Sequence, residues 1–187
     1  MRAFLAIPID DAVRDRIVET QKALQRADAG VRWVARENLH LTLKFLGDVA
    51  EPEISRLSER LGLEAQRFPS MDLDLSGVGR FPPGGPPRVV WVGCRGDVSR
   101  LVGLAQAVER VATELGFPSE ERRFTPHLTI GRVKSPKNQE RLLNALAARH
   151  DDVFGRARAE HFTLFRSTLT PDGPIYEQVV RFPLGVA

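Results

Sequence analysis

The spacing of apolar residues in the first half of the chain predicts alternating strands and helices. Residues 4–7 form an apolar run typical of a buried strand, and Val13, Ile17 and Leu24 recur at the spacing of one helix face. Asp10 or Asp11 can cap that helix, because a short carboxylate side chain accepts hydrogen bonds from the first free backbone amides. The pattern predicts, in order, strand 4–7, helix 10–26, strands 31–34 and 39–46, a helix opened by Pro52, and the strictly alternating strand 71–75.

The second half shows the same alternation of patterns. Leu101, Leu104, Val108 and Val111 have helical spacing, and Gly116 provides a stop signal after them. The composition of residues 81–87, rich in proline and glycine, predicts a loop between the halves. The expected elements are strand 89–92, helix 97–115, strand 127–133, a helix opened by residues 135–136, and strands 157–165 and 175–182 with a turn at 171–174.

The two halves share a register as well as an order of elements. A shift of 87 residues lays Asp10 on Asp97 at a helix start, and lays His40 with Thr42 on His127 with Thr129. Identities are few, but agreement in element order, caps and one chemical tripeptide favours an ancient duplication. We therefore expect an α+β fold of two lobes related by a pseudo-twofold axis, each an antiparallel sheet backed by helices, with a central cleft. Residues 1–187 should form a single domain of two intertwined lobes.

Composition narrows the class of protein. Of the 187 residues, 42% are apolar and 27% are charged, which is typical of a globular chain, and the net charge is only +3. Such a charge suits a small anion or a short stretch of RNA better than a long nucleic acid. A single cysteine, Cys94, excludes an internal disulfide and fits a reducing cytoplasm. No window reaches the ~20 apolar residues of a membrane span, and no spacing of ligands suits a metal.

Three of the four histidines begin a His-x-Thr tripeptide. Alternate residues of a strand share a face, so His40 projects with Thr42, and His127 projects with Thr129. The third copy begins at His161 and has no counterpart under the 87-residue shift, so we interpret it as coincidental. His150 should be a solvated residue.

Two imidazoles facing one cleft suit general acid–base catalysis near neutral pH. Two threonine hydroxyls suit the oxygens of a tetrahedral anion. The imidazoles and the hydroxyls together favour metal-free chemistry on a cyclic phosphodiester.

Extended motifs surround both tripeptides. Asn38-Leu-His40-Leu-Thr42-Leu-Lys-Phe-Leu-Gly47 and Thr125-Pro-His127-Leu-Thr129-Ile-Gly-Arg132 resemble the paired motifs of the two-histidine (2H) phosphoesterases, and within them the RNA 2′,3′-cyclic phosphodiesterases, also called 2′-5′ RNA ligase-like proteins. The resemblance covers nearly the whole chain. It implies a bilobal fold with a central cleft and hydrolysis of a terminal 2′,3′-cyclic phosphate to a 2′-phosphate, without a cofactor.

The resemblance also implies roles for single residues. His40 would donate a proton to the departing 3′ oxygen and His127 would accept one from water, although the near symmetry of the sequence does not itself assign these roles. Thr42 and Thr129 would bind phosphate oxygens, and Arg132 matches an arginine that meets the ligand.

Strand parity bears on two further cleft candidates. It puts Arg132 on the face opposite His127, unless the strand bends near Gly131. It puts Lys44 on the same face as His40, where the lysine could either add positive charge at the edge of the cleft or be solvated. Trp33, Phe81 and Trp91 are candidates for stacking on a base, with core packing favoured for Trp91.

Several readings of function stay open from sequence. The leading hypothesis is a metal-independent cyclic phosphodiesterase, a monomer acting on an RNA end or a small cyclic nucleotide, with no membrane partner. A 2′-5′ RNA ligase would use the same residues in the reverse direction. A non-catalytic nucleotide- or RNA-binding module would keep the cleft without needing two titrating groups. A hydrolase of another cyclic phosphate, such as a sugar derivative, is the remaining reading.

Overall fold

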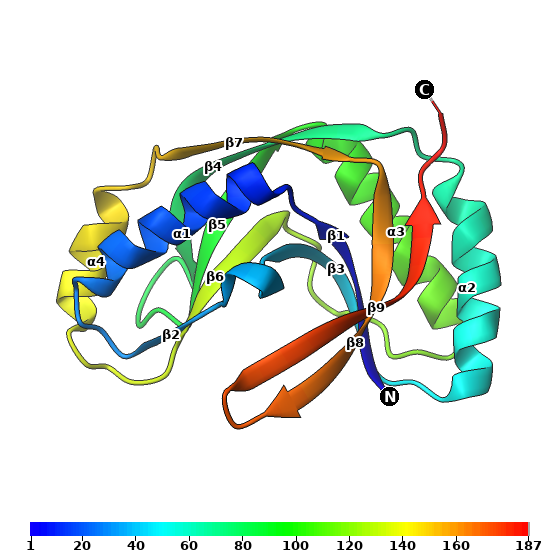
Figure 1. Cartoon of the computed structure of the whole chain (residues 1–187), viewed down its shortest axis with the longest axis horizontal. Coiled ribbons are helices and arrows are strands. Elements are labelled where there is room, and N and C mark those ends of the chain that lie inside the picture. The colour runs from blue at the N-terminus through cyan, green and yellow to red at the C-terminus, as the bar shows by residue number, and fades with distance from the viewer. Residues whose placement is uncertain (187) are drawn as a thin grey trace.

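A computed structural model describes residues 1–186 as two antiparallel sheets with helices packed beside them (Figure 1). The predicted α+β class is therefore confirmed. In spatial order, the four-stranded sheet contains β3 (His40–Asp48), β1 (Arg2–Pro8), β8 (His161–Thr170) and β9 (Gly173–Pro183). The five-stranded sheet contains β2 (Val31–Trp33), β6 (His127–Val133), β5 (Val89–Gly96), β4 (Met71–Phe81) and β7 (Val153–Ala159).

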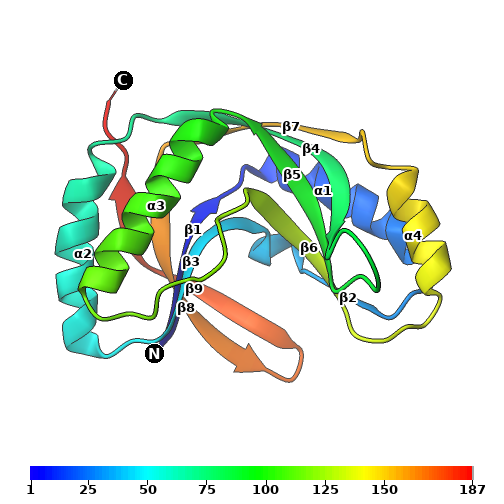
Figure 2. The same cartoon turned by 180° about the vertical axis from the view of Figure 1, so that it is seen from behind.

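The helices form two pairs, one beside each sheet (Figures 1 and 2). The second and third helices pack on each other next to the four-stranded sheet, and the first and fourth do so next to the five-stranded sheet. Their bounds are α1 (Asp11–Gln25), α2 (Glu51–Ala65), α3 (Val98–Glu114) and α4 (Gln139–Ala147), with a short 3-10 turn η1 (Arg36–Asn38). None of the helices within residues 1–186 is both long enough and apolar enough to cross a membrane.

The two sequence halves exchange strands and helices. The four-stranded sheet joins β1 and β3 to β8 and β9, and the five-stranded sheet joins β2 and β4 to three strands of the second half. A lobe of the structure is therefore not a contiguous half of the chain. β1 and β5 begin 87 residues apart, as do α1 and α3, and as do β3 and β6. Because each sheet needs strands from both halves, both halves contribute to one continuous hydrophobic core.

One predicted strand is wrong. The sequence pattern predicts a single strand at 157–165, but β7 ends at Ala159 and β8 begins at His161, with exposed Glu160 between them. β7 pairs with β4 in the five-stranded sheet, whereas β8 pairs with β1 in the four-stranded sheet. The chain thus crosses from one sheet to the other inside what reads as one strand-like stretch. The helix expected from residues 135–136 also begins later, at Gln139, after Asn138 in a left-handed conformation (φ 49°).

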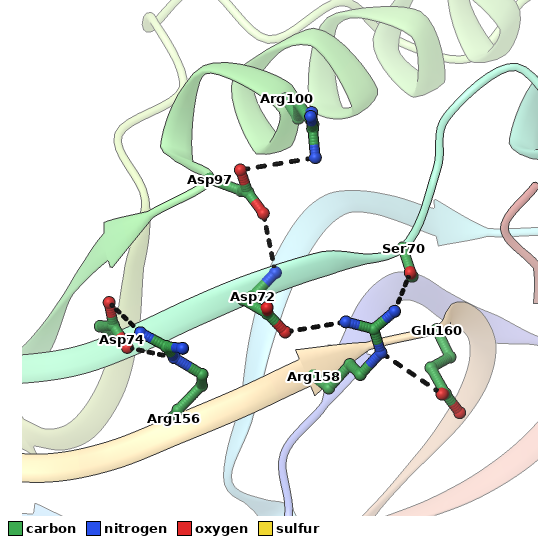
Figure 3. Close-up of polar contacts among 8 residues, drawn as sticks. All are labelled: Ser70, Asp72, Asp74, Asp97, Arg100, Arg156, Arg158 and Glu160. Carbon is green, nitrogen blue, oxygen red and sulfur yellow. Dashed lines mark hydrogen bonds and ion pairs between the residues drawn. The ribbon is translucent and has the colours of Figure 1, made fainter. Parts of the chain in front are cut away.

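Cross-strand ion pairs hold the edge strand β7 in register with β4 (Figure 3). Arg156 lies opposite Asp74 and donates to its carboxylate at 2.9 Å, and Arg158 lies opposite Asp72 and donates at 3.1 Å. Asp97, just before α3, accepts the backbone amide of Asp72 at 2.9 Å. Opposite charges across a strand pair each add a modest stabilisation, and here they also fix the register of an edge strand.

Gly131 of β6 allows β2 to approach closely, and this predicts a large effect of one methyl group. A Cβ at Gly131 would lie 2.8 Å from a methyl carbon of Val31 and 3.0 Å from the ring of Trp33. Gly131→Ala should lower the free energy of unfolding by about 1–3 kcal/mol, because the added methyl group forces the side chains of Val31 and Trp33 to shift. The matched control is Gly62→Ala in α2, where a Cβ would meet no atom within 4 Å and alanine should stabilise the helix. Chemical denaturation of both variants measures the difference, and equal effects would contradict this account.

Candidate functional site

A cavity of about 1130 Å³ opens between the two sheets, and both histidine–threonine pairs line it. His40 and Thr42 come from β3, and His127 and Thr129 come from β6. These two strands contact each other across the boundary between the sheets. The structure therefore brings together two histidine–threonine pairs that lie 87 positions apart in the sequence.

Each histidine is oriented by the backbone in the same way. Nδ1 of His40 lies 2.7 Å from the carbonyl oxygen of Asn38, and Nδ1 of His127 lies 2.7 Å from that of Thr125. A carbonyl oxygen only accepts, so Nδ1 carries the hydrogen and Nε2 of the neutral ring is left with its lone pair. Asn38 also anchors the β8–β9 hairpin, because its side-chain amide donates to the carbonyl of Pro174 at 2.8 Å. Two rigidly held imidazoles thus have Nε2 available for proton transfer.

A β-bulge interrupts both histidine strands at the same position. In β3 the pairing with β1 passes from Thr42 to Lys44 and leaves Leu43 unpaired. In β6 the pairing with β5 passes from Thr129 to Gly131 and leaves Ile130 unpaired. A bulge adds one residue and inverts the alternation of faces beyond it. Strict strand parity therefore fails after the threonine in both strands.

The bulge in β6 places Arg132 in the wall of the cavity, where simple parity had put it on the opposite face. The predicted bend near Gly131 takes the form of this bulge, one residue earlier in the pairing. The equivalent bulge in β3 gives Phe45 the same position on the other side, and Phe45 also lines the cavity. Phe45 was not among the residues predicted from sequence, although it stands five residues after His40 as Arg132 stands five after His127.

Lys44 is not the solvated lysine that the sequence allowed. Its side chain is only 3% exposed, and its ammonium donates to the Glu109 carboxylate at 2.7 Å and to the Pro118 carbonyl at 2.9 Å. Burial alone would raise the pKa of Glu109, but hydrogen bonds from Lys44 and the Glu120 amide hold it below its usual value. Lys44 borders the cavity, but its charge is engaged with α3 and the loop that follows. It therefore adds little free positive potential for a ligand.

Aromatic rings surround His40 more closely than His127. Phe4 stacks on His40 with ring centres 4.8 Å apart, and Tyr176 meets it edge-on at 5.4 Å. His127 meets the ring of Phe81 edge-on at 5.0 Å. Burial lowers the pKa of His40 from 6.5 to about 4, opposed by the hydrogen bond to Asn38 and reinforced by the charges of Arg14 and Arg132. With this pKa, His40 is neutral at physiological pH.

Unpaired cations line the cavity. Arg32 lies directly opposite Arg132 in the β2–β6 pairing, an arrangement of like charges that destabilises a sheet. Arg122, Arg123 and Lys134 line the same cavity, and within residues 1–186 none of these five side chains forms an ion pair. The modest net charge of +3 is thus distributed so that unneutralised positive charge collects at one site. Such an arrangement attracts an anionic ligand.

The remaining predicted residues lie in different places. His161 lines a separate, smaller cavity with Arg181, and His150 is exposed beside Asp151, so neither lies in the wall of the large cavity. Trp33 and Phe81 line the large cavity, whereas Trp91 packs over Gly79 and against Phe81. Within residues 1–186 there is no cluster of three or more histidine, cysteine or carboxylate side chains arranged to hold a metal ion.

The protein thus belongs to a class of α+β proteins in which two interleaved antiparallel sheets enclose one cationic cavity with two histidines. Comparison with known proteins identifies the family. A family model described as LigT like Phosphoesterase matches residues 7–91 and 94–176, two stretches that begin 87 residues apart. The chain therefore belongs to the LigT-like phosphoesterase family, within the two-histidine phosphoesterases.

Relatives and solved structures agree with this family. Proteins named RNA 2′,3′-cyclic phosphodiesterase from Methanothermobacter thermautotrophicus and Archaeoglobus fulgidus are 36% and 39% identical, over 98% and 96% of this chain and 99% and 98% of theirs. The structure of TT0787 from Thermus thermophilus matches with a TM-score of 0.84 at 30% identity, covering 100% of this chain and 99% of that one. E. coli LigT complexed with 3′-AMP matches with a TM-score of 0.78 at 29% identity, covering 98% and 97%.

The buried pair of Lys44 and Glu109 predicts a cost for removing one partner. Lys44→Met should lower the free energy of unfolding by about 2 kcal/mol, because it leaves the Glu109 carboxylate without its cation in a partly buried place. Combining it with Glu109→Gln should recover part of that loss. Lys22→Met serves as the control, since Lys22 pairs with Glu19 on the exposed surface and such pairs contribute little. A Lys44→Met protein as stable as the Lys22→Met protein would show that the ion pair between Lys44 and Glu109 does not stabilise the fold.

The lowered pKa of His40 predicts a particular dependence of stability on pH. In the unfolded chain this imidazole has its ordinary pKa of 6.5, whereas in the native protein it is about 4. Between these values the unfolded state binds more protons, so stability is full above pH 6.5 and is lost as the pH falls toward 4, by up to about 3 kcal/mol. The free energy of unfolding, measured with urea at several pH values from 4.5 to 7.5, should depend less on pH in His40→Asn than in His150→Asn. An identical dependence on pH in the two variants would show that His40 titrates normally.

Proposed function

We propose that this enzyme hydrolyses the 2′,3′-cyclic phosphate end of RNA, or of a small cyclic nucleotide, to a 2′-phosphate by two-histidine acid–base catalysis without a metal. The observation that carries the proposal is the matched pair of imidazoles in one cavity, each with Nδ1 tied to a backbone carbonyl and Nε2 free. Relatives named RNA 2′,3′-cyclic phosphodiesterase, which align over nearly the whole chain, support the choice of reaction.

The reaction needs two proton transfers and no change of oxidation state. One imidazole takes a proton from water through Nε2 as the water oxygen attacks phosphorus. The bond from phosphorus to the 3′ oxygen breaks, and the other imidazole gives its proton to that leaving oxygen. The hydroxyls of Thr42 and Thr129 donate hydrogen bonds to the non-bridging oxygens, and Arg132 opposes their charge. Because the two imidazoles supply both transfers and come from one chain, a metal-free monomer is sufficient.

The two histidines have different roles in the proposed reaction. We assign His127 as the proton acceptor and His40 as the donor, the assignment that the family resemblance implies. Burial, reinforced by the charges of Arg14 and Arg132, lowers the pKa of His40 to about 4. A phosphodiester anion beside Arg132 offsets that positive charge and attracts a proton to the adjacent imidazole, so its pKa rises on binding. Substrate binding thus shifts His40 toward the protonated state that donation requires.

The size and charge of the cavity favour an RNA end over a free mononucleotide. The cavity of about 1130 Å³ is lined by Arg122, Arg123 and Lys134 in addition to Arg32 and Arg132. One cyclic phosphate carries a single negative charge, so the further cations suit the backbone phosphates of the nucleotides that precede the end.

The decisive test is incubation with nucleoside 2′,3′-cyclic phosphates and a short cyclic-ended RNA in the presence of EDTA, with identification of the products. We expect 2′-phosphates, and a loss of about 10²–10⁴-fold in turnover for His40→Asn and for His127→Asn. His150→Asn, at an exposed histidine outside the cavity, should retain full activity.

Loss of activity on chelation, or a near-normal rate in either cavity variant, would refute the mechanism. Formation of 2′-5′ linkages from RNA halves under the same conditions would instead identify a ligase using the same residues.

A further inference from the structure

Asn38 and Thr125 occupy equivalent positions in the two halves of the chain, each two residues before a cavity histidine. The backbone carbonyl of each faces Nδ1 of that histidine at 2.7 Å. Their surroundings differ, because Thr125 is exposed whereas Asn38 is buried, with 8% of its surface accessible. Burial of a side-chain amide is costly unless the amide forms a hydrogen bond. The side chain of Asn38 therefore has a structural partner that the exposed position of Thr125 does not require.

That partner is a carbonyl in the β8–β9 hairpin. Nδ2 of Asn38 donates to the carbonyl oxygen of Pro174, near the start of β9, at 2.8 Å. Asn38 ends η1, which follows β2 of the five-stranded sheet, whereas β9 is an edge strand of the four-stranded sheet. In Figure 1 the turn of this hairpin extends beyond the rest of its sheet on the side of β2. The hydrogen bond thus ties the hairpin of one sheet to the segment that leads into β3.

The hairpin returns to His40 through an aromatic ring. Tyr176 stands two residues after Pro174 and meets the His40 ring edge-on, with ring centres 5.4 Å apart. The backbone of Asn38 therefore holds Nδ1 of the imidazole, and its side chain holds the hairpin segment that packs against the same imidazole. One buried amide connects both supports of the ring.

We propose that Asn38 is a positioning residue for His40, which sets the direction of the imidazole through its own carbonyl and through the β8–β9 hairpin. The proposal rests on the proposed function, in which Nε2 of His40 gives a proton to the leaving 3′ oxygen. Proton transfer requires hydrogen-bond geometry at the reacting atom, and a small displacement of a catalytic group costs a large factor in rate. Because the proposed phosphate contacts come from other residues, loss of the amide should lower turnover much more than affinity.

The test is Asn38→Ala, with two readouts. In hydrolysis of a nucleoside 2′,3′-cyclic phosphate, kcat should fall by about 10–100-fold while KM changes little. In ¹H–¹⁵N spectra of the histidine rings, recorded without substrate, the Nδ1 proton of His40 should exchange faster and its signal should broaden. The corresponding signal of His127 is an internal reference and should stay sharp, because the carbonyl of Thr125 still accepts its hydrogen bond.

Gln66→Ala is the matched control. Gln66 also donates from a side-chain amide to a proline carbonyl of β9, that of Pro183 at 2.8 Å, but at the opposite end of the strand. This variant should leave kcat and both histidine signals unchanged. Asn38→Ser provides a milder version of the test, since its hydroxyl is one bond shorter than the amide nitrogen and loses the contact with Pro174. It should show the same selective changes as Asn38→Ala.

Two results would overturn the proposal. One is an unchanged kcat together with an unchanged His40 signal in both Asn38 variants. The other is equal broadening of the His40 and His127 signals, which would indicate a general loosening of the fold instead of a specific support. Because the spectra need no turnover, the outcome is distinct from a failure of the proposed reaction. A protein that cleaves no cyclic phosphate but loses the His40 signal alone would refute the function and retain the positioning of the ring by Asn38.

Discussion

Strand exchange between the two halves of the chain is the constraint on which the cleft depends. Each sheet takes strands from both halves, so neither sheet can form until distant parts of the chain have met. This arrangement sets β3 against β6, and with them the two histidines, across the boundary between the sheets. A continuous hydrophobic core then holds the two sheets together, and the cavity lies between rigid elements instead of between mobile loops. Side chains on strands keep a fixed geometry, which the proposed proton transfers require.

The two histidines are alike in their hydrogen bonding and different in their surroundings. Both donate from Nδ1 to a carbonyl two residues earlier in the chain, which gives both rings the same tautomer. His40 lies within a group of aromatic rings that removes water from it, whereas His127 meets the ring of Phe81 at its edge. Equivalent positions in a duplicated scaffold thus lie in different environments, and the burial of His40 lowers its pKa.

The β3 and β6 sides of the cavity also differ in their unpaired charge. Lys44, on the β3 side, is buried and neutralised by Glu109, where it supports the loop after α3. On the β6 side, Arg32 and Arg132 lie next to each other without a counter-ion in residues 1–186. Two adjacent arginines cost stability in a sheet, and a protein tolerates this where a ligand supplies the missing negative charge. The net charge alone would not have located this site.

Local patterns in the sequence were enough for the class of fold, most of the elements, the two His-x-Thr tripeptides and the family. Periodicity and parity are rules about neighbouring residues, so they are enough for the elements and the tripeptides, whereas the family follows from the resemblance of the extended motifs.

The tertiary structure decided what those rules could not. A bulge arises from pairing with another strand, so it could not be read from the sequence of β3 or β6 alone. The bulge in β6 places Arg132 in the cavity wall, whereas strict strand parity predicts the opposite face. The break at Glu160 likewise exists because β7 and β8 have partners in different sheets. Only the folded chain shows that Phe45 and Arg132 occupy matched places on opposite sides of one cavity.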